Sequence, residues 1–226
     1  ATLAAKQATD GIGLPVVFSV VTDPVGSEIV ESMQHPGGNI TGVAFGFQEA
    51  RRLEWLVRIA PDIRQIYIPF NPKDKSPVLA LKMARNAAAK LGVELIIREV
   101  HDPEMLNNAV FNIPAEADAV FLLPDSLLTT RLTDLVTAAN KRNLPTSAAN
   151  IRTVQSNHVL TSFGKDPSLA GKQAARMADQ IFKGAGPADL PVETAEFYLA
   201  INLKVAKIIG LTVPDAILRQ AHLIVR

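Results

Sequence analysis

The chain has 226 residues, 48% of them apolar, and is long enough to bury a substantial core. Its 23 Lys and Arg residues nearly balance its 22 Asp and Glu residues, so its charge gives no support to nucleic-acid binding. Cysteine is absent, which excludes disulfides and thiolate metal sites, and the apolar runs are far shorter than the roughly 20 residues of a membrane span.

Strand-like apolar runs alternate with helical patterns along most of the chain. This alternation indicates an α/β protein built from βαβ units, with parallel sheets and right-handed crossovers. The predicted strands are 16–21, 42–45, 65–70, 94–100, 119–123, 146–148, 159–163 and 197–201. The predicted helices are 2–8, 25–33, 48–59, 76–91, 103–111, 127–142, 168–182 and 203–209.

The predicted helix at residues 2–8 has no strand before it. Because a βαβ sheet rarely opens with a helix, we expect upstream strands that this chain does not contain, and hence an amino-terminal truncation. The first residues have neither the basic nor the apolar region of an export signal, but this carries little weight in a chain that is expected to start within a fold. The absence of cysteine leaves the compartment open.

Two α/β modules follow from the order of elements. The first covers about residues 1–64, and the second begins at residue 65 with a new strand–helix–strand series. Two such modules joined by short connections form a cleft with a hinge, which closes on small ligands by rigid-body motion.

Two polar turns near the start of the chain are candidates for one side of the cleft, because ligands bind at the carboxyl ends of parallel strands. Asp23 follows the strand at 16–21, where it either faces the cleft or caps the helix that Pro24 opens; the capping interpretation is favoured. Thr41 and Gly42 offer a hydroxyl and a close backbone approach to an anionic group. Their alternative is a tight turn that needs glycine for its conformation alone.

Three further candidates follow strands of the second module. Asp125 and Ser126 come after the strand at 119–123, where Asp125 could accept hydrogen bonds from a ligand ammonium; the alternative is that Asp125 or Ser126 caps the next helix. Asn71 ends the strand at 65–70, and an Asn-Pro turn is its structural alternative.

Aromatic side chains could stack on an apolar or aromatic ligand, although phenylalanine is more often part of a core. The candidates are Phe45, Phe47 and Phe163. Trp55 lies within a helical pattern and is interpreted as packing.

No constellation of residues supports catalysis. The four histidines are scattered without metal-ligand spacing, and no zinc site, cofactor site or metal site is predicted. Glu28 and Glu31 are expected on the solvated face of a helix, and Gly37-Gly38 lacks the lysine and further glycine of a phosphate-binding loop. The sequence therefore predicts a protein that holds a ligand, not an enzyme.

Several segments resemble the ABC-transporter substrate-binding protein family that includes TrpX-like proteins. They run in family order over the whole chain, and two of them are specific: DPVG followed by PGGNITGV, and INLKVAKIIGLTVP. The others are KLGVEL, ADAVFLLPDS and MADQIFKGAGPADLPVE.

The resemblance implies a two-lobed type I periplasmic-binding-protein-like fold, crossed three times by the chain, with parallel sheets flanked by helices. Lobe 1 is expected over 1–64 plus 165–191 and incomplete at its amino terminus, and lobe 2 over 65–164 plus 192–226. It further implies an exported receptor, periplasmic or lipid-anchored at the cell surface. Such a receptor delivers a small polar ligand, amino-acid-like or aromatic, to an ABC permease; no nucleic-acid partner is expected.

One stretch departs from the family pattern. Family members often have a glycine pair before a Ser-Tyr-Gly strand end, whereas here residues 155–158 read QSNH and the strand ends in Ser162-Phe163-Gly164. A plain ring replaces a hydroxyl-bearing one, which removes one reason to expect the amino-acid ligand of characterised relatives. Two alternatives stay open: the effector-binding core of a LacI-type regulator, and a doubly wound enzyme.

Overall fold

A computed structural model describes residues 1–156 and 158–226, and the chain divides into two compact units. The first consists of residues 1–47 and 165–197, and the second of 48–164 and 198–226. The sequence predicts divisions at 64/65 and 191/192, whereas the structure places residues 192–197 in the first unit and residues 48–64 in the second. The reason is the apolar face of helix α2 (Glu49–Ile59), whose Leu53 and Leu56 pack into the core of the second unit.

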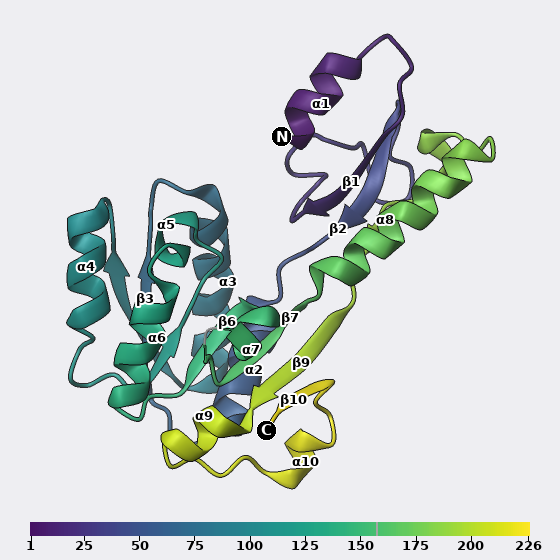
Figure 1. Ribbon diagram of the computed structural model, residues 1–226. Coiled ribbons are helices and arrows are strands. Elements are labelled where there is room, and N and C mark those ends of the chain that lie inside the picture. The colour runs from purple at the N-terminus through teal and green to yellow at the C-terminus, as the bar shows by residue number, and fades with distance from the viewer. Residues whose placement is uncertain (157) are drawn as a thin grey trace. The chain divides into compact units, whose positions relative to one another are not determined.

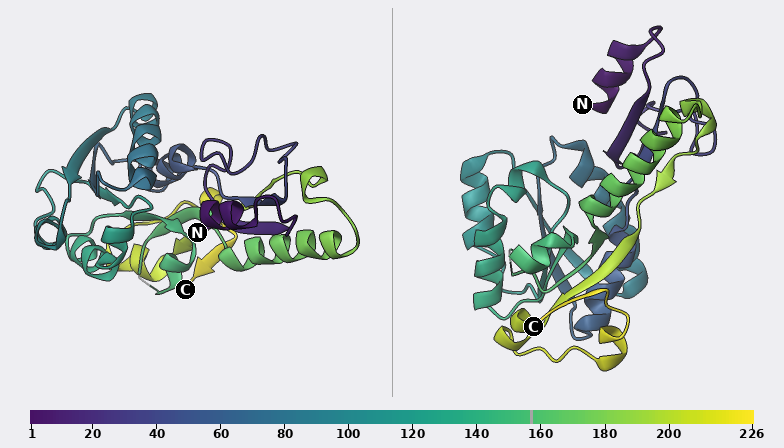
Figure 2. Two further views of the ribbon diagram at one scale, coloured as in Figure 1. Left: turned by 90° about the horizontal axis from the view of Figure 1, so that it is seen from above. Right: turned by 45° about the vertical axis from the view of Figure 1, so that its right-hand side comes forward.

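The first unit contains a parallel sheet, which in the described part of the chain has the order β1-β2-β8. Helix α8 runs alongside β1 and β2, as both views of Figure 2 show. Phe18 and Ile40 lie in the hydrophobic core of the first unit. The elements are α1 (Thr2–Thr9), β1 (Val16–Val21), β2 (Ile40–Ala44), α8 (Pro167–Phe182), the 3-10 helix η1 (Pro187–Asp189) and β8 (Glu193–Thr194).

The predicted helix at residues 25–33 is wrong, because this segment forms consecutive turns. Glu28 adopts a left-handed conformation with φ of 56°, which interrupts a right-handed helix. The amides of Ile29 and Val30 both donate to the carbonyl of Pro24. Their side chains are buried nonetheless. The apolar pattern therefore predicted which residues are buried, but not the secondary structure of the segment. The expected helix face carrying Glu28 and Glu31 is therefore absent.

The second unit is built on a larger sheet, which in the described residues has the order β10-β9-β7-β6-β5-β3-β4 (Figure 1). The pairings of β3 with β4 and β5, and of β5 with β6, are parallel. The strands are β3 (Gln65–Phe70), β4 (Glu94–Glu99), β5 (Ala119–Phe121), β6 (Thr146–Asn150), β7 (Thr161–Lys165), β9 (Phe197–Asn202) and β10 (Leu223–Val225).

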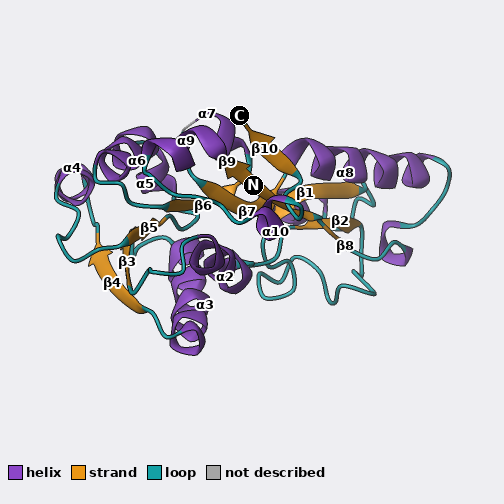
Figure 3. Cartoon of the chain, turned by 90° about the horizontal axis from the view of Figure 1, so that it is seen from below, coloured by secondary structure: helices purple, strands orange, loops and turns teal. Residues whose placement is uncertain are grey.

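Helices cover both faces of this sheet. Figure 3 shows α2 and α3 on one side and α4 and α6 on the other, in agreement with two separate clusters of buried residues. Besides α2, the helices are α3 (Lys75–Leu91), α4 (Pro103–Phe111), α5 (Ser126–Thr129), α6 (Leu132–Lys141), α7 (Arg152–Ser156), α9 (Leu203–Ile208) and α10 (Asp215–Leu218). None of the helices described here is long and apolar enough to cross a membrane.

The helix predicted over 127–142 is divided into α5 and α6. The hydroxyls of Thr129 and Thr130 donate to the carbonyls of Asp125 and Leu127, at 2.6 and 2.7 Å. Threonine hydroxyls that bond to the preceding turn compete with helix propagation, which accounts for the break.

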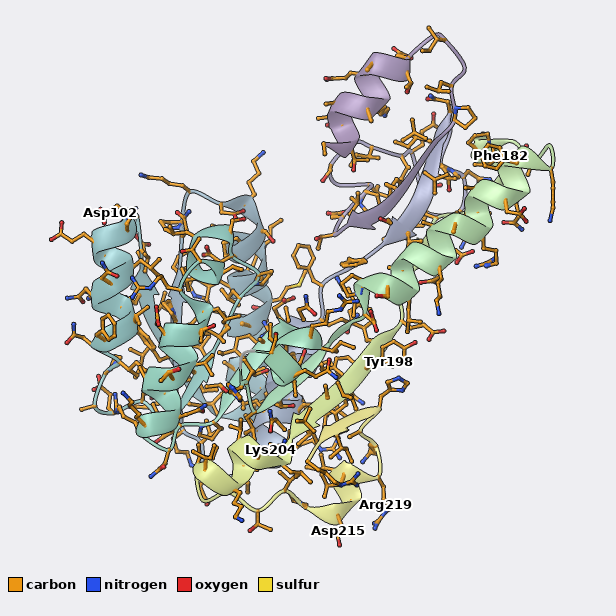
Figure 4. The ribbon with its side chains drawn as sticks, viewed as in Figure 1. Asp102, Phe182, Tyr198, Lys204, Asp215 and Arg219 are labelled. Carbon is orange, nitrogen blue, oxygen red and sulfur yellow. The ribbon has the colours of Figure 1, made fainter. Side chains whose placement is uncertain are left out.

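Helix starts follow the predicted capping pattern. Asp102, labelled at the start of α4 in Figure 4, accepts a hydrogen bond from the amide of Met105, and Asp166 accepts one from Ser168. Gly92 ends α3 with φ of 67°, as its position predicts. Strands β1 and β3 have the predicted bounds.

Candidate ligand-binding site

The carboxylate of Asp125 joins two loops at the carboxyl edge of the larger sheet. Its Oδ1 accepts hydrogen bonds from the amides of Leu127 and Leu128, at 2.9 and 3.1 Å, which confirms that Asp125 caps α5. Its Oδ2 accepts one from the amide of Asn71, at 2.6 Å, in the loop after β3. Asp125 is 3% exposed, and its carboxylate accepts three backbone amides. Its main role in the structure is therefore to hold these loops together.

Ser126 and Asn71 lie on either side of this carboxylate. Ser126 is exposed as the first residue of α5, and Asn71 is half-buried. The Asn71 side chain accepts a hydrogen bond from the amide of Lys73, which confirms the predicted turn. The structure therefore brings together the three candidates of the second module, Asn71, Asp125 and Ser126, although their contact with a ligand stays a prediction.

Strand β2 begins two residues earlier than predicted, and this places Thr41 and Gly42 inside a strand and not in a turn before it. Thr41 is fully buried, and its hydroxyl donates to the carbonyl of Leu190 at 2.7 Å. Gly42 has φ of 156°, and a Cβ there would overlap the backbone of Phe18. Both residues thus have structural roles, and ligand contact by them stays a prediction.

Asp23 lies in the turn that follows β1. Its Oδ1 accepts a hydrogen bond from the amide of Gly26 at 2.8 Å, so it caps this turn and not the predicted helix. No described helix follows Pro24 in this segment. Ligand contact by Asp23 stays a prediction.

Lys165, the last residue of β7, places a cation beside the residues that follow β2, and the sequence analysis did not single it out. The ammonium of Lys165 donates to the carbonyl of Gly46 at 3.0 Å, and lies 4.1 Å from the ring centroid of Phe45 and 5.3 Å from that of Phe197. All four residues belong to the first unit, next to the points where the chain passes to the second. No local motif marks Lys165, because its contacts come from segments distant in sequence.

Phe163 packs beside Trp55 in the second unit, with ring centroids 6.4 Å apart. Trp55 is buried, and the guanidinium of Arg58 lies 4.4 Å from its ring, which confirms the packing interpretation of this tryptophan. Phe163 is only partly buried, and stacking on a ligand stays a prediction for it. Asn157, in the stretch that departs from the family pattern, lies outside the described residues.

A buried arginine on α2 also escaped the sequence analysis. Arg52 is 1% exposed, and burial lowers the pKa of its guanidinium to about 10, against the opposing effect of Glu49. The spacing of Glu49 and Arg52 is visible in the sequence, but it also fits an exposed pair on a helix surface. Within the described ranges, no three His, Asp or Glu side chains gather to hold a metal ion.

Two parallel sheets, each flanked by helices, define a type I periplasmic-binding-protein-like fold. One similar solved structure is a conserved domain protein from Vibrio cholerae: 28% identity, TM-score 0.81, covering 93% of this chain and 71% of that one. Another is an ABC domain in complex with L-Trp from Streptococcus pneumonia: 24% identity, TM-score 0.81, covering 93% and 72%.

The chain belongs to the family of ABC transporter substrate binding proteins, which it matches over residues 1–225. A curated relative is the tyrosine-binding protein of Clostridioides difficile (strain R20291), 25% identical over 193 residues and 85% of this chain. The chain spans about half, 55%, of the length of that relative. Membership in a family of binding proteins favours neither the regulator nor the enzyme alternative.

Proposed function

We propose that the protein binds an aromatic amino acid as an extracytoplasmic receptor and delivers it to an ABC permease. The observation that carries the proposal is the family match over residues 1–225. The ligand class is supported by the relative named for tyrosine and by the similar domain solved with L-Trp. An exported location, periplasmic or lipid-anchored, is part of the same proposal.

The second unit supplies suitable groups for such a ligand. An amino acid has an ammonium that needs acceptors and a carboxylate that needs donors. The exposed hydroxyl of Ser126 and the side chain of Asn71 offer both at a sheet edge typical of ligand binding, and Asp125 holds them in place. In this proposal Phe163 borders the aromatic ring of the ligand.

In the first unit, the side chains of Asp23 and Thr41 have fewer groups left for a ligand, because they are engaged in hydrogen bonds within the unit. Its contribution is proposed through the loops after β1 and β2, which include Asp23, with Gly42 as the close backbone approach. The two units act as the two lobes. Contacts that a ligand makes only in a closed state shift the open–closed equilibrium, and the permease recognises that state.

A ligand screen on the full-length protein tests this function. Titration with L-tyrosine, L-tryptophan and L-phenylalanine, with L-leucine and L-glutamate as controls, is followed by thermal unfolding and calorimetry. A ligand at 100 times its Kd stabilises the native state by about 2.7 kcal/mol, so the Tm rises measurably. If no aromatic amino acid raises the Tm, or if the controls raise it equally, the proposed ligand class is wrong.

A further inference from the structure

Glu49 and Arg52 form a buried ion pair on α2. They lie one helical turn apart, with side chains 5% and 1% exposed, and Arg52 Nη2 is 3.6 Å from Glu49 Oε1. The guanidinium carbon of Arg52 also lies 3.8 Å from the ring centroid of Phe121, on β5. The pair therefore belongs to the contact between α2 and the sheet of the second unit.

Arg52 connects the carboxyl end of β5 to the second residue of β6. Its Nη1 donates to the carbonyl of Leu122 at 2.8 Å and to that of Ser147 at 3.2 Å. The carbonyl of Ser147 also accepts the amide of Leu122, so the guanidinium reinforces the ladder between β5 and β6. Leu122 precedes Asp125 by three residues. The carbonyl that Arg52 bonds therefore lies at the start of the loop that carries Asp125.

Stability alone does not explain this arrangement. Burial disfavours the charged guanidinium and lowers its pKa, and buried ion pairs are often no more stabilising than apolar side chains of the same volume. Arg52 Nη2, Glu49 Oε2 and Ser147 Oγ are buried without a hydrogen-bond partner in the structure. The pair instead fixes position, because a planar guanidinium on α2 that bonds two carbonyls holds both strands in one place relative to the helix.

We propose that Arg52 is a positioning residue for ligand binding, which holds the carboxyl end of β5 against β6 and α2 and thereby sets the loop of Asp125 and Ser126. The ligand part of this inference rests on the proposed function. Glu49 balances the charge of Arg52 and orients its guanidinium. Because α2 begins one residue after the chain enters the second unit at residue 48, the same contact also fixes that entry.

Hydrogen exchange of the ligand-free protein tests the positioning without any ligand. The variant E49L/R52M replaces both charges by apolar side chains of similar size. We expect at least tenfold faster exchange at the amides that Asp125 accepts, those of Asn71, Leu127 and Leu128, with unchanged exchange in β4. The control R51M removes an exposed arginine of the same helix and is expected to leave these amides unchanged.

Calorimetry with L-tyrosine then tests the consequence. We expect E49L/R52M to weaken binding at least tenfold while its Tm stays near that of the wild type, which a purely structural role would not produce. If wild-type protein does not bind L-tyrosine, the proposed ligand is wrong, but the exchange experiment still decides the role of Arg52.

R52K is a second variant, in case the double variant does not fold. Lysine keeps a charge beside Glu49 but lacks the planar guanidinium that lies over the Phe121 ring while its Nη1 bonds both carbonyls. Faster exchange at Asn71, Leu127 and Leu128 in R52K supports the inference. Wild-type exchange at these amides, in either folded variant, overturns it.

Discussion

The carboxylate of Asp125 accepts the backbone amide of Asn71 at 2.6 Å and so ties the loop after β3 to the loop after β5. These residues are 54 positions apart in sequence, and each follows a strand of the same parallel sheet. The same carboxylate caps α5. A single buried side chain thus arranges two loops whose exposed groups are the proposed ligand contacts.

The first prediction concerns this carboxylate. Asp125→Ala is expected to cost about 2–3 kcal/mol of unfolding free energy, because it removes a helix cap and leaves the buried amide of Asn71 without its acceptor. Urea denaturation measures this loss. Asp125→Asn, which keeps a capping oxygen, is expected to lose less. If Asp125→Ala binds the ligand as tightly as wild type, the role of Asp125 is capping alone.

The second prediction separates structure from ligand contact at Thr41. Thr41→Val keeps the shape of the side chain but removes the hydroxyl that donates to Leu190, at an expected cost of about 1 kcal/mol or somewhat more, since that carbonyl loses a buried partner. Thr41→Ser keeps the hydroxyl and serves as control. Calorimetry of both variants shows whether affinity follows the hydroxyl; equal affinities in Val and Ser variants would contradict ligand contact.

The third prediction concerns Gly42, where the strand passes close to the backbone of Phe18. Gly42→Ala is expected to destabilise the first unit by about 2–4 kcal/mol, because the new Cβ overlaps the Phe18 carbonyl and the backbone φ of 156° suits glycine. Gly171→Ala in α8 is a matched control, with nothing within 4 Å of its Cβ. It is expected to be stabilising by about 0.5–1 kcal/mol, as in other helix interiors. If thermal unfolding shows that Gly42→Ala and Gly171→Ala change the stability equally, the argument from the close approach of Phe18 is wrong.

The fourth prediction is a pH dependence. Burial raises the pKa of Tyr67 to about 12, only partly opposed by Arg98, and its hydroxyl donates to the carbonyl of Ala109 at 3.1 Å. Since the folded pKa lies above that of the unfolded chain, this contribution to stability is complete below about pH 10 and is lost as the pH rises towards 12.

Absorbance at 295 nm measures the ionisation of Tyr67 directly. The chain has two tyrosines, so Tyr198→Phe isolates the signal of Tyr67. Tyr67→Phe is expected to remove the high-pH titration and to cost about 1 kcal/mol at neutral pH through the lost hydrogen bond. A Tyr67 signal that titrates near pH 10 in the folded protein would contradict the burial argument.

The alternation of strands and helices was predicted well because period and capping are local properties. Asp102 and Asp166 cap the helices at which their sequence position placed them. The helix predicted over 25–33 failed because the left-handed backbone at Glu28 depends on how the turn packs Ile29 and Val30, not on their spacing.

The candidate site was predictable only where neighbouring strands end. Asn71 and Asp125 follow parallel strands, so their proximity follows from topology. Thr41 was misplaced by a shift of two residues in a strand boundary, which turned a loop hydroxyl into a buried one. Arg52 could not be found, because a charge becomes notable only once packing has buried it.

The second unit is assembled from residues 48–164 and 198–226, with part of the first unit synthesised in between. In the sheet β7 lies next to β9, yet Asn202, the last residue of β9, comes 37 positions after Lys165, the last residue of β7. At the usual rates of translation the ribosome needs roughly 2–7 s to synthesise that interval. During that time a nascent sheet presents an unpaired strand edge, the kind of surface on which chaperones act and aggregates start.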